Sequence, residues 1–314
     1  MDGEARGDER RGSAVNISVV LCTYNRADSL RRALESLSRQ QLPSGLEREV
    51  LIVDNNSNDH TRAVADEAAS TLPCRYIFEP RQGKSFALNT ALATAKGDLI
   101  VFTDDDLTMD EAWLAGLWRA FLAHPDCVGF GGRIVSVWSG PKPAWYSDSG
   151  AYKLINGVVV SYDHGPETKE VGMLPFGANM AFRREVFVTH GGFNLDLGSK
   201  RLMRGEDTEF CRRVKNGGGR ILYVGDATVY HPVEPARMRR GYFQSWYFSF
   251  GRRDVVVEPL PPDAVRLFRV PPHVYLSLIA ETFTWLTTFD SQRRFFHKLN
   301  VWRHLGQFAE FRHT

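Results

Sequence analysis

The sequence predicts an α/β protein built on a doubly wound sheet. Short apolar runs alternate with helical patterns from residue 16 onward, and three of these runs end in polar residues. Strands separated by helices pair in parallel through right-handed crossovers, which gives a doubly wound sheet. With 43% hydrophobic and 24% charged residues among 314, the composition is that of a folded chain with a large core.

The first two units are each a strand, a turn and a helix. ISVVLCT (17–23) is typical of a buried strand, residues 24–26 form a polar turn, and three leucines between 30 and 37 recur at helical spacing. EVLIVDNN (49–56) predicts the next strand. Asp59 is suited to cap a helix that continues to residue 69.

The third unit leads into an acidic strand end. CRYIFEP (74–80) is a short strand, and an alanine-rich helix is expected over 84–95. DLIVFT (98–103) then predicts a strand that runs into Asp104-Asp105-Asp106. Ligands of parallel sheets bind beyond the carboxyl ends of the strands. The polar groups after the first, second and fourth strands should therefore converge on one crevice.

Regular alternation ends after a helix predicted at 110–124. Strands are expected at 127–138 and 173–182, and two short strands are expected between 221 and His231. Helices are predicted to begin near Arg184 and to span 206–216. The predicted organisation is a disordered tail (1–15), a main domain (16–235) and a basic, aromatic helical extension (236–314).

Composition excludes several classes of protein. The 39 Lys and Arg nearly balance the 37 Asp and Glu, so no global field attracts nucleic acid, and no nucleic-acid partner is predicted. The four cysteines form no CxxC pair, which argues against a zinc module or a disulfide framework and favours the cytoplasm. The apolar stretch 274–289 is interrupted by Glu281 and is too short to span a bilayer.

The Asp104–Asp106 triplet is the first candidate for chemistry. Three adjacent carboxylates repel one another unless a cation or a tight turn relieves them. Because the triplet follows an apolar strand at the crevice, a metal role is favoured over a solvated acidic turn. Hard oxygen ligands suit Mg²⁺ or Mn²⁺, which bridge carboxylates to substrate phosphates.

A nucleotide is the predicted phosphate compound, although the usual nucleotide loops are missing. No GxxxxGK[ST] occurs, and no GxGxxG follows the first strand. Asp54 and Asn55 offer acceptors and donors suited to a base edge or a ribose. Arg81 and Lys84 are suited to a diphosphate, with exposed loop cations as the equal alternative.

These motifs together resemble inverting glycosyltransferases of family 2, which have a GT-A fold. The resemblance covers about residues 16–231 and rests on VVLCTYNRADSLRRALESLSRQ, LIVDNNSNDHT, residues 81–89, GDLIVFTDDD, GGFN and GEDTEFCRRV. It implies a Rossmann-like mixed sheet with a nucleotide-binding half and an acceptor-binding half, plus the C-terminal helical extension. The implied nucleotide-sugar ligands are Thr23, Tyr24, Asn25, Asp54, Asn55, Asp104 and Asp105. Asp106 is implied as the main metal ligand, with Asp104 near the ribose or metal.

The resemblance also assigns residues later in the chain. Asp207 matches the family's catalytic base, which takes the proton of the acceptor hydroxyl, and Glu206 is expected to bind acceptor hydroxyls. Helix capping is the alternative for this pair. His231 is implied as an extra metal ligand, at even odds with a packed core histidine. Gly177 and Asn179 lie where the family strand faces the donor sugar, the alternative being a bulged strand.

Three peripheral features have open interpretations. Trp138, Trp145, Tyr146 and Tyr152 are suited either to stack on an acceptor sugar or to fill the core. The loop 194–204, with Lys200, Arg201 and Arg204, is either a lid over the diphosphate or a mobile surface loop. The basic amphipathic segment 293–312 either lies on an anionic membrane, which would favour a lipid-linked acceptor, or packs on the protein.

The prediction is a glycosyltransferase that requires Mn²⁺ or Mg²⁺ and inverts the sugar. Its donor is a nucleotide-diphosphate sugar, with uridine favoured, and its acceptor is a hydroxyl of a saccharide or a lipid-linked molecule. It is expected in the cytoplasm, with a peripheral contact on the inner membrane surface if the C-terminal segment binds lipid. The alternatives are a sugar-phosphate nucleotidyltransferase and a non-catalytic protein that binds nucleotide sugars or glycans.

Overall fold

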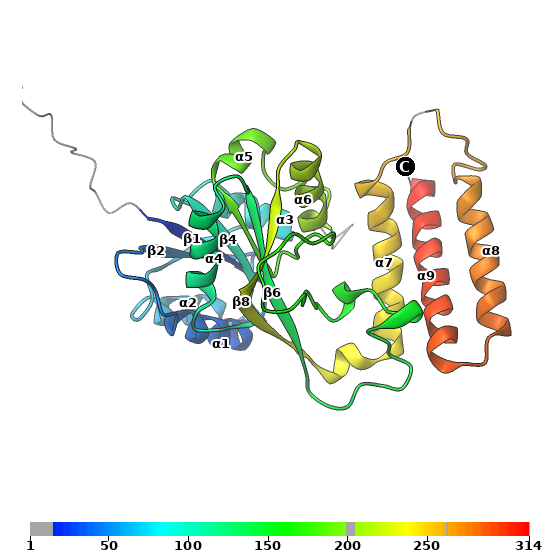
Figure 1. The fold of residues 1–314 in the computed structure, drawn as a ribbon, viewed down its shortest axis with the longest axis horizontal. Coiled ribbons are helices and arrows are strands. Elements are labelled where there is room, and N and C mark those ends of the chain that lie inside the picture. Colours follow the sequence, from blue (N-terminus) through cyan, green and yellow to red (C-terminus); the bar gives the residue numbers. More distant parts are fainter. Residues whose placement is uncertain (1–14, 199–204, 262, 314) are drawn as a thin grey trace, which may run out of the picture.

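The structure is a computed structural model that describes residues 15–198, 205–261 and 263–313. A sheet with helices on both faces forms one part, and three long helices form the other (Figure 1). The strands are β1 (Ile17–Thr23), β2 (Arg48–Asp54), β3 (Cys74–Phe78), β4 (Leu99–Asp104), β5 (Thr108–Met109), β6 (Gly129–Trp138), β7 (Asn179–Arg183) and β8 (Ile221–Val233). The helices of the sheet part are α1 (Ala27–Ser38), α2 (Thr61–Ala68), α3 (Lys84–Leu92), α4 (Trp113–Ala123), α5 (Glu185–His190) and α6 (Glu206–Asn216).

The sheet has the strand order β3-β2-β1-β4-β7-β6-β8-β5 and is mixed. β3, β2, β1 and β4 are parallel, which confirms the doubly wound half predicted from the first 104 residues. β7 is antiparallel to β4 and to β6, and β6 pairs in parallel with β8. The second half therefore departs from regular alternation, as a GT-A mixed sheet requires.

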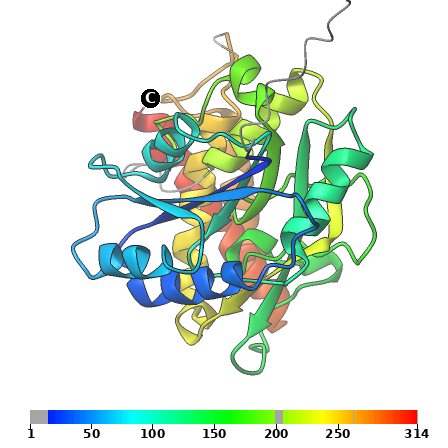
Figure 2. The ribbon, with the colours of Figure 1, turned by 90° about the vertical axis from the view of Figure 1, so that its left-hand side faces the viewer.

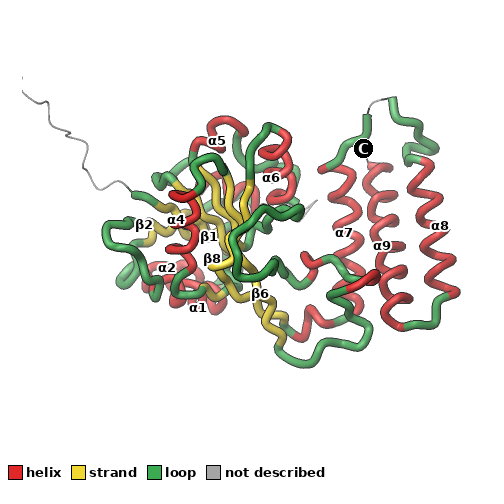
Figure 3. Tube along the Cα trace, viewed as in Figure 1, coloured by secondary structure: helices red, strands yellow, loops and turns green. Residues whose placement is uncertain are grey.

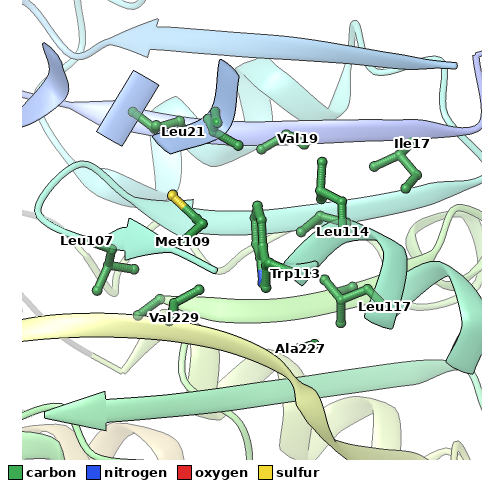
Figure 4. Packing of buried hydrophobic residues seen from close by; sticks show 14 of the residues in the cluster. Ile17, Val19, Leu21, Leu107, Met109, Trp113, Leu114, Leu117, Ala227 and Val229 are labelled. Carbon is green, nitrogen blue, oxygen red and sulfur yellow. The ribbon is translucent and has the colours of Figure 1, made fainter. Parts of the chain in front are cut away.

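Two apolar layers hold the sheet between its helices. α1, α2 and α4 cover one face, where Trp113 packs beside Leu114, Leu117 and Val229 (Figure 4). α1 and α2 lie together below the sheet edge that faces the viewer in Figure 2. α3, α5 and α6 cover the other face, where Phe102 and Phe210 are buried. Both strand faces are buried, which explains why the parallel strands are continuous apolar runs.

Several predicted boundaries were wrong. The α3 helix ends at Leu92 instead of residue 95, and α4 spans 113–123 instead of 110–124. The two short strands expected after residue 220 are one 13-residue strand, β8, whose pairing with β6 shifts register at Gly132/Arg133. The strand expected over 173–182 begins only at Asn179, because residues 177 and 178 form a turn.

The C-terminal part is a layer of three helices that lie side by side in Figure 1, with α9 in the middle. Its helices are α7 (Arg240–Val257), α8 (Pro272–Thr287) and α9 (Ser291–His313). α9 packs against both neighbours, and β6 and β8 extend toward this part from the sheet (Figure 3). At one crossing, α7 and α9 approach so closely that a Cβ on Gly251 would lie 1.8 Å from the Arg303 carbonyl oxygen.

Candidate functional site

A cavity of about 970 Å³ lies at the carboxyl ends of β1 and β4 and reaches across to α7. Its sheet side is polar and charged, and its opposite wall is mostly apolar. The lining residues that were predicted for the site are Thr23, Tyr24, Asn55, Lys84, Asp104, Asp105, Asp106, Gly177, Glu206, Asp207 and His231. The other wall includes Ile155, Val160, Tyr242, Trp246 and Phe250. The cavity therefore brings together most of the predicted residues.

The acidic triplet is neutralised by three cationic side chains that come from different loops. Lys84 Nζ donates to Asp104 Oδ1 at 2.6 Å. Arg26 Nη1 donates to Asp105 Oδ1 and to Asp106 Oδ2, both at 3.1 Å. Arg237 Nη2 donates to Asp106 Oδ2 at 3.0 Å. The repulsion expected among three carboxylates is thus relieved by cations of the protein itself.

Lys84 connects the triplet to the start of α6. Its Nζ lies 3.8 Å from Glu206 Oε1 in addition to its bond with Asp104. Burial acts to lower the pKa of Lys84, but Asp104, Glu206 and Asp207 outweigh it and raise that pKa, so the ammonium stays charged. Burial raises the pKa of Glu206 to about 7, the charge of Asp207 adds to this rise, and the nearby Lys84 offsets only part of it.

Asp105 lies deeper than its neighbours. Its Oδ2 accepts a hydrogen bond of 2.7 Å from Thr23 Oγ1, and only 4% of the residue is exposed. Burial raises its pKa to about 6, against the attraction of Arg26 and the Thr23 hydrogen bond. The hydrogen bond to Asp105 therefore connects the end of β4 to the end of β1. It also holds the backbone from which Asp104 and Asp106 face the cavity.

Asp106 and His231, two of the predicted metal ligands, lie next to each other. His231 Nε2 lies 3.8 Å from Asp106 Oδ1 and 3.0 Å from Arg237 Nη1. The histidine is 1% exposed, its Nδ1 has no hydrogen-bond partner among the described residues, and burial lowers its pKa, so neutral imidazole is favoured. In the described part of the chain, no three His, Cys, Asp or Glu side chains are grouped as metal ligands.

Asp207 faces the turn before β7. Its Oδ2 accepts the backbone N–H of Gly177 at 2.9 Å, and its Oδ1 accepts the N–H of Thr208 at 2.6 Å. Gly205 precedes α6 with φ +105°, a left-handed conformation that favours glycine. Gly205 holds the N-cap position, while Asp207 lies at the cavity wall and also satisfies one first-turn N–H of α6. The helix-capping contact and the position at the cavity therefore hold together.

The turns after β1 and β2 position this site by hydrogen bonds to each other. The Asn25 N–H donates to Ser57 Oγ at 2.8 Å, and Asp54 Oδ2 accepts from the Tyr76 hydroxyl at 2.7 Å. The Asn55 side chain accepts the Gly83 N–H at 2.8 Å and donates to the Arg81 carbonyl at 2.6 Å. Asn55 thereby holds the loop that places Lys84 at the start of α3.

Four predicted ligands lie outside the cavity lining, all among the described residues: Asn25, Asp54, Arg81 and Asn179. Arg81 turns toward Glu79, which it meets with two hydrogen bonds of 2.8 Å. Asn179 is fully buried and is bonded to the Trp113 indole and to the carbonyls of Arg133 and Ala227. Its amide joins β7 to α4, β6 and β8, which is a role in packing.

Sequence reasoning missed four cations and one wall of the cavity. The missed cations are Arg26, Arg212, Arg237 and Arg253, which line the site although none was among the predicted ligands. Arg26 follows Asn25 directly in the first turn, so its position at a strand end was a usable signal. Arg237 lies in a 3₁₀ turn after β8, and α7 supplies Trp246 and Phe250, whose rings stack with centroids 5.0 Å apart.

The remaining peripheral features are placed as follows. Trp145 packs edge-on against Phe243 and Phe295, and Tyr146 is buried in the same cluster, so core filling accounts for these aromatics. Trp138 and Tyr152 are packed against Tyr146 and Phe296. Lys200, Arg201 and Arg204 of the expected lid lie outside the described residues.

The mixed sheet and the acidic cavity at its strand ends define a GT-A glycosyltransferase. The profile of glycosyl transferase family 2 matches residues 18–191, more than half of the chain, so this chain belongs to that family. The chain is 26% identical over 259 residues to the glucosyl-dolichyl phosphate glucuronosyltransferase of Haloferax volcanii, covering 80% of both chains. It is 26% identical over 241 residues to the succinoglycan biosynthesis protein ExoM of Rhizobium meliloti, covering 76% of this chain and 74% of ExoM.

Solved structures show the same fold. The mannosyltransferase PcManGT of Pyrobaculum calidifontis, in complex with GDP-Man and Mn²⁺, has a TM-score of 0.62 at 20% identity and covers 94% of this chain and 86% of its own. S. aureus TarS in complex with UDP-GlcNAc has a TM-score of 0.57 at 19% identity, covering 86% of this chain and 71% of its own. The predicted fold class and the predicted glycosyltransferase activity are confirmed.

Proposed function

We propose that this glycosyltransferase moves a sugar from a nucleoside-diphosphate sugar to a hydroxyl of a saccharide or lipid-linked acceptor, with inversion at the anomeric carbon. One observation carries the proposal: Asp207 and the Asp104–Asp106 triplet line the same cavity, with Lys84 between them. Lys84 thus stands between a carboxylate suited to receive a proton and an acidic cluster suited to a site for a phosphorylated leaving group.

The reaction needs one displacement. The acceptor oxygen forms a bond to the anomeric carbon while the bond from that carbon to the diphosphate oxygen breaks, and the diphosphate leaves with the electron pair. Asp207 takes the proton of the acceptor hydroxyl. Because the nucleophile arrives opposite the leaving group, the configuration inverts.

The departing diphosphate gains negative charge, which the cavity's cations are suited to stabilise. Lys84, Arg26 and Arg237 are the cations that already contact the triplet. A phosphate bound beside the triplet would compete with these carboxylates for the same donors. Family membership favours this sugar transfer over the nucleotidyltransferase alternative.

The site's donors fit a divalent cation. Asp106 Oδ1 and the neutral His231 Nε2 face each other at 3.8 Å, and Asp104 lies at the same strand end. In sites that handle phosphates, Mg²⁺ is held by one or two carboxylates together with phosphate oxygens of the substrate, and Mn²⁺ takes the same oxygen ligands, so a two- or three-residue set is sufficient. Asp106, Asp104 and His231 would hold the ion, which would supply a Lewis acid for the diphosphate when bound.

The donor and acceptor are proposed from the surroundings of the cavity. Relatives in solved structures are bound to UDP-GlcNAc and GDP-Man, which supports a nucleotide-sugar donor, and we retain uridine as the base. The name of the Haloferax relative includes a dolichyl phosphate, a lipid carrier, which supports a lipid-linked acceptor. The apolar wall from α7 is the part of the cavity suited to the acceptor.

The test uses Asp207→Asn, which keeps an oxygen for the Gly177 N–H but no longer takes a proton. UDP-, GDP- and dTDP-sugars are screened with and without Mn²⁺, reading thermal stabilisation and slow donor hydrolysis. We expect one donor to stabilise wild type and variant alike when metal is present, and hydrolysis by the variant to fall about 10²–10⁴-fold.

Glu209→Gln is the matched control. Glu209 lies in the same turn of α6 but pairs with Arg213 outside the cavity lining, so its loss should leave turnover unchanged. Near-normal turnover by the Asp207 variant would remove the proposed base. Donor binding without turnover by wild type would instead favour the non-catalytic alternative.

A further inference from the structure

The outward side of α8 carries a continuous apolar surface. Leu276, Ile279, Phe283 and Leu286 are between 62% and 69% exposed, and their spacing of three or four residues places them on one side of the helix. We call these four residues the outer α8 face. Scattered exposed leucines are ordinary, but a contiguous exposed apolar surface marks an interaction site.

The packing of α8 explains which side is outward. α8 packs on α9, and it lies at the edge of the molecule away from the sheet (Figure 1). Its single carboxylate, Glu281, is bound on the α9 side by His297 at 2.6 Å and Asn300 at 3.2 Å. The helix contains no Lys or Arg, so the outer α8 face has no charge of its own.

Both ends of the face continue into exposed apolar residues. Val265 and Phe268 precede α8 and are 78% and 82% exposed, and Phe289 follows it at 95%. The Tyr275 hydroxyl donates to the Leu267 carbonyl at 2.9 Å, which fastens the preceding segment to the first turn of the helix. The exposed apolar surface therefore runs the full length of α8.

Arginines lie at both ends of this surface. Arg266 and Arg269 precede α8 and are exposed, and Arg269 reaches the carbonyl of Arg312 at the end of α9. Arg293 and Arg294 follow Phe289 and are exposed as well. These four arginines compare with two carboxylates in the same segments, Asp263 and Asp290, of which Asp290 caps α9 through the Arg293 N–H.

We propose that the outer α8 face docks on an anionic lipid bilayer, with α8 lying in the plane of the interface. An apolar helix face with cations at its borders matches acyl chains beside anionic headgroups. A second copy of the chain fits less well. Either direction of α8–α8 pairing would bring the arginine-bearing ends of two copies together, which costs electrostatic free energy.

The proposed membrane contact lies on α8, whereas the sequence suggested a contact through the segment 293–312, which is part of α9. The stripe of α9 is used inside the protein, since Phe295 and Leu299 are 4% and 0% exposed. No described helix is long and apolar enough to cross a bilayer, so a docked α8 would lie on the surface. The inference does not depend on the proposed sugar transfer.

The test is flotation of the full chain with vesicles of phosphatidylcholine, alone or with about one third phosphatidylglycerol. Wild type should float with the anionic vesicles. Ile279→Gln with Phe283→Gln should weaken this binding by about tenfold or more, because two exposed apolar side chains no longer enter the interface. Arg266→Gln with Arg294→Gln should weaken binding to the anionic vesicles and reduce its dependence on salt.

Matched controls come from the sheet part. Leu122→Gln with Val188→Gln removes two apolar residues that are 61% and 85% exposed, and Arg39→Gln with Lys215→Gln removes two exposed cations. Both should bind like wild type, and all variants should keep the wild-type melting temperature. Equal losses in test and control variants, or no flotation of wild type, would overturn the proposal. A dimer seen by light scattering and abolished by the α8 variant would do so too, by assigning the face to a second copy.

Discussion

Buried carboxylates are treated differently in the two parts of the molecule. In the helical part, Asp254 is bonded to Arg303 and Arg253 at 2.8 Å each, and Glu310 is bonded to Arg252 at 2.9 Å. At the strand ends, Lys84 contacts both Asp104 and Glu206, and Arg26 is divided between Asp105 and Asp106. Cations that each serve one carboxylate stabilise a fold, whereas cations shared between carboxylates indicate a site prepared for a ligand.

Removing the shared lysine is expected to give the largest effect. Lys84→Met removes the cation that contacts both Asp104 and Glu206. Breaking a fully buried ion pair costs about 3–5 kcal/mol of unfolding free energy, and the lower end, about 3 kcal/mol, is expected here because Lys84 and Asp104 are 33% and 28% exposed. Urea unfolding near neutral pH measures it. The loss should shrink when the pH is lowered and the carboxylates are protonated.

Arg303→Met supplies the comparison in the helical part. Asp254 keeps its bond with Arg253 in that variant, so the loss should be smaller than that of Lys84→Met. Arg62→Met is the second control, because Arg62 pairs with the exposed Asp66 outside the cavity. If the lysine variant were as stable as either control, the shared-cation description of the strand ends would be wrong.

The sequence predicted the parallel half of the fold well for a physical reason. Each of its strands is an apolar run that ends in a polar turn, so Thr23, Asn55 and Asp104 could be assigned to one sheet edge from local patterns. Long cations are harder to assign, because Arg237 reaches Asp106 from 131 residues away along the chain. Asn179 was predicted to face the donor sugar, but β7 begins at Asn179 directly after the turn at 177–178. This start sets the direction of the side chain, which bonds Trp113 in the core.

The helical part should depend on close backbone packing more than on charge. A Cβ at Gly251 would lie 1.8 Å from the Arg303 carbonyl oxygen, and one at Gly306 would lie 2.0 Å from that of Phe248. Gly251→Ala should therefore force α7 and α9 apart at a cost of about 1–3 kcal/mol, nearly independent of pH and salt. Urea unfolding at two salt concentrations measures this.

Gly241→Ala is a control on the same helix. No heavy atom of the described residues lies within 4 Å of the Cβ it would gain, so only helix propensity changes, and alanine is favoured by about 1 kcal/mol. We expect opposite signs for the two substitutions. A stabilising Gly251→Ala would mean that the crossing of α7 and α9 is looser than these contacts indicate.

The smallest expected effect concerns the pH dependence of stability at the strand ends. Burial raises the pKa of Glu206 from 4.5 to about 7 in the folded protein, so folding favours the neutral carboxyl. Below 4.5 the group is protonated in both states and its contribution to stability is fully present. As the pH rises toward 7 the unfolded chain loses the proton first, and this contribution is progressively lost. Glu206→Gln removes that dependence.

Unfolding free energies of the wild type and Glu206→Gln are therefore compared at about pH 5 and about pH 6. The difference should shift in favour of the variant by about 1 kcal/mol over this interval, since one titrating proton contributes at most about that much per pH unit. Parallel pH profiles would show that Glu206 is already ionised in the folded protein. Lys84 would then form ion pairs with two ionised carboxylates, and Glu206 would no longer differ from the ionised, arginine-paired carboxylates of the helical part.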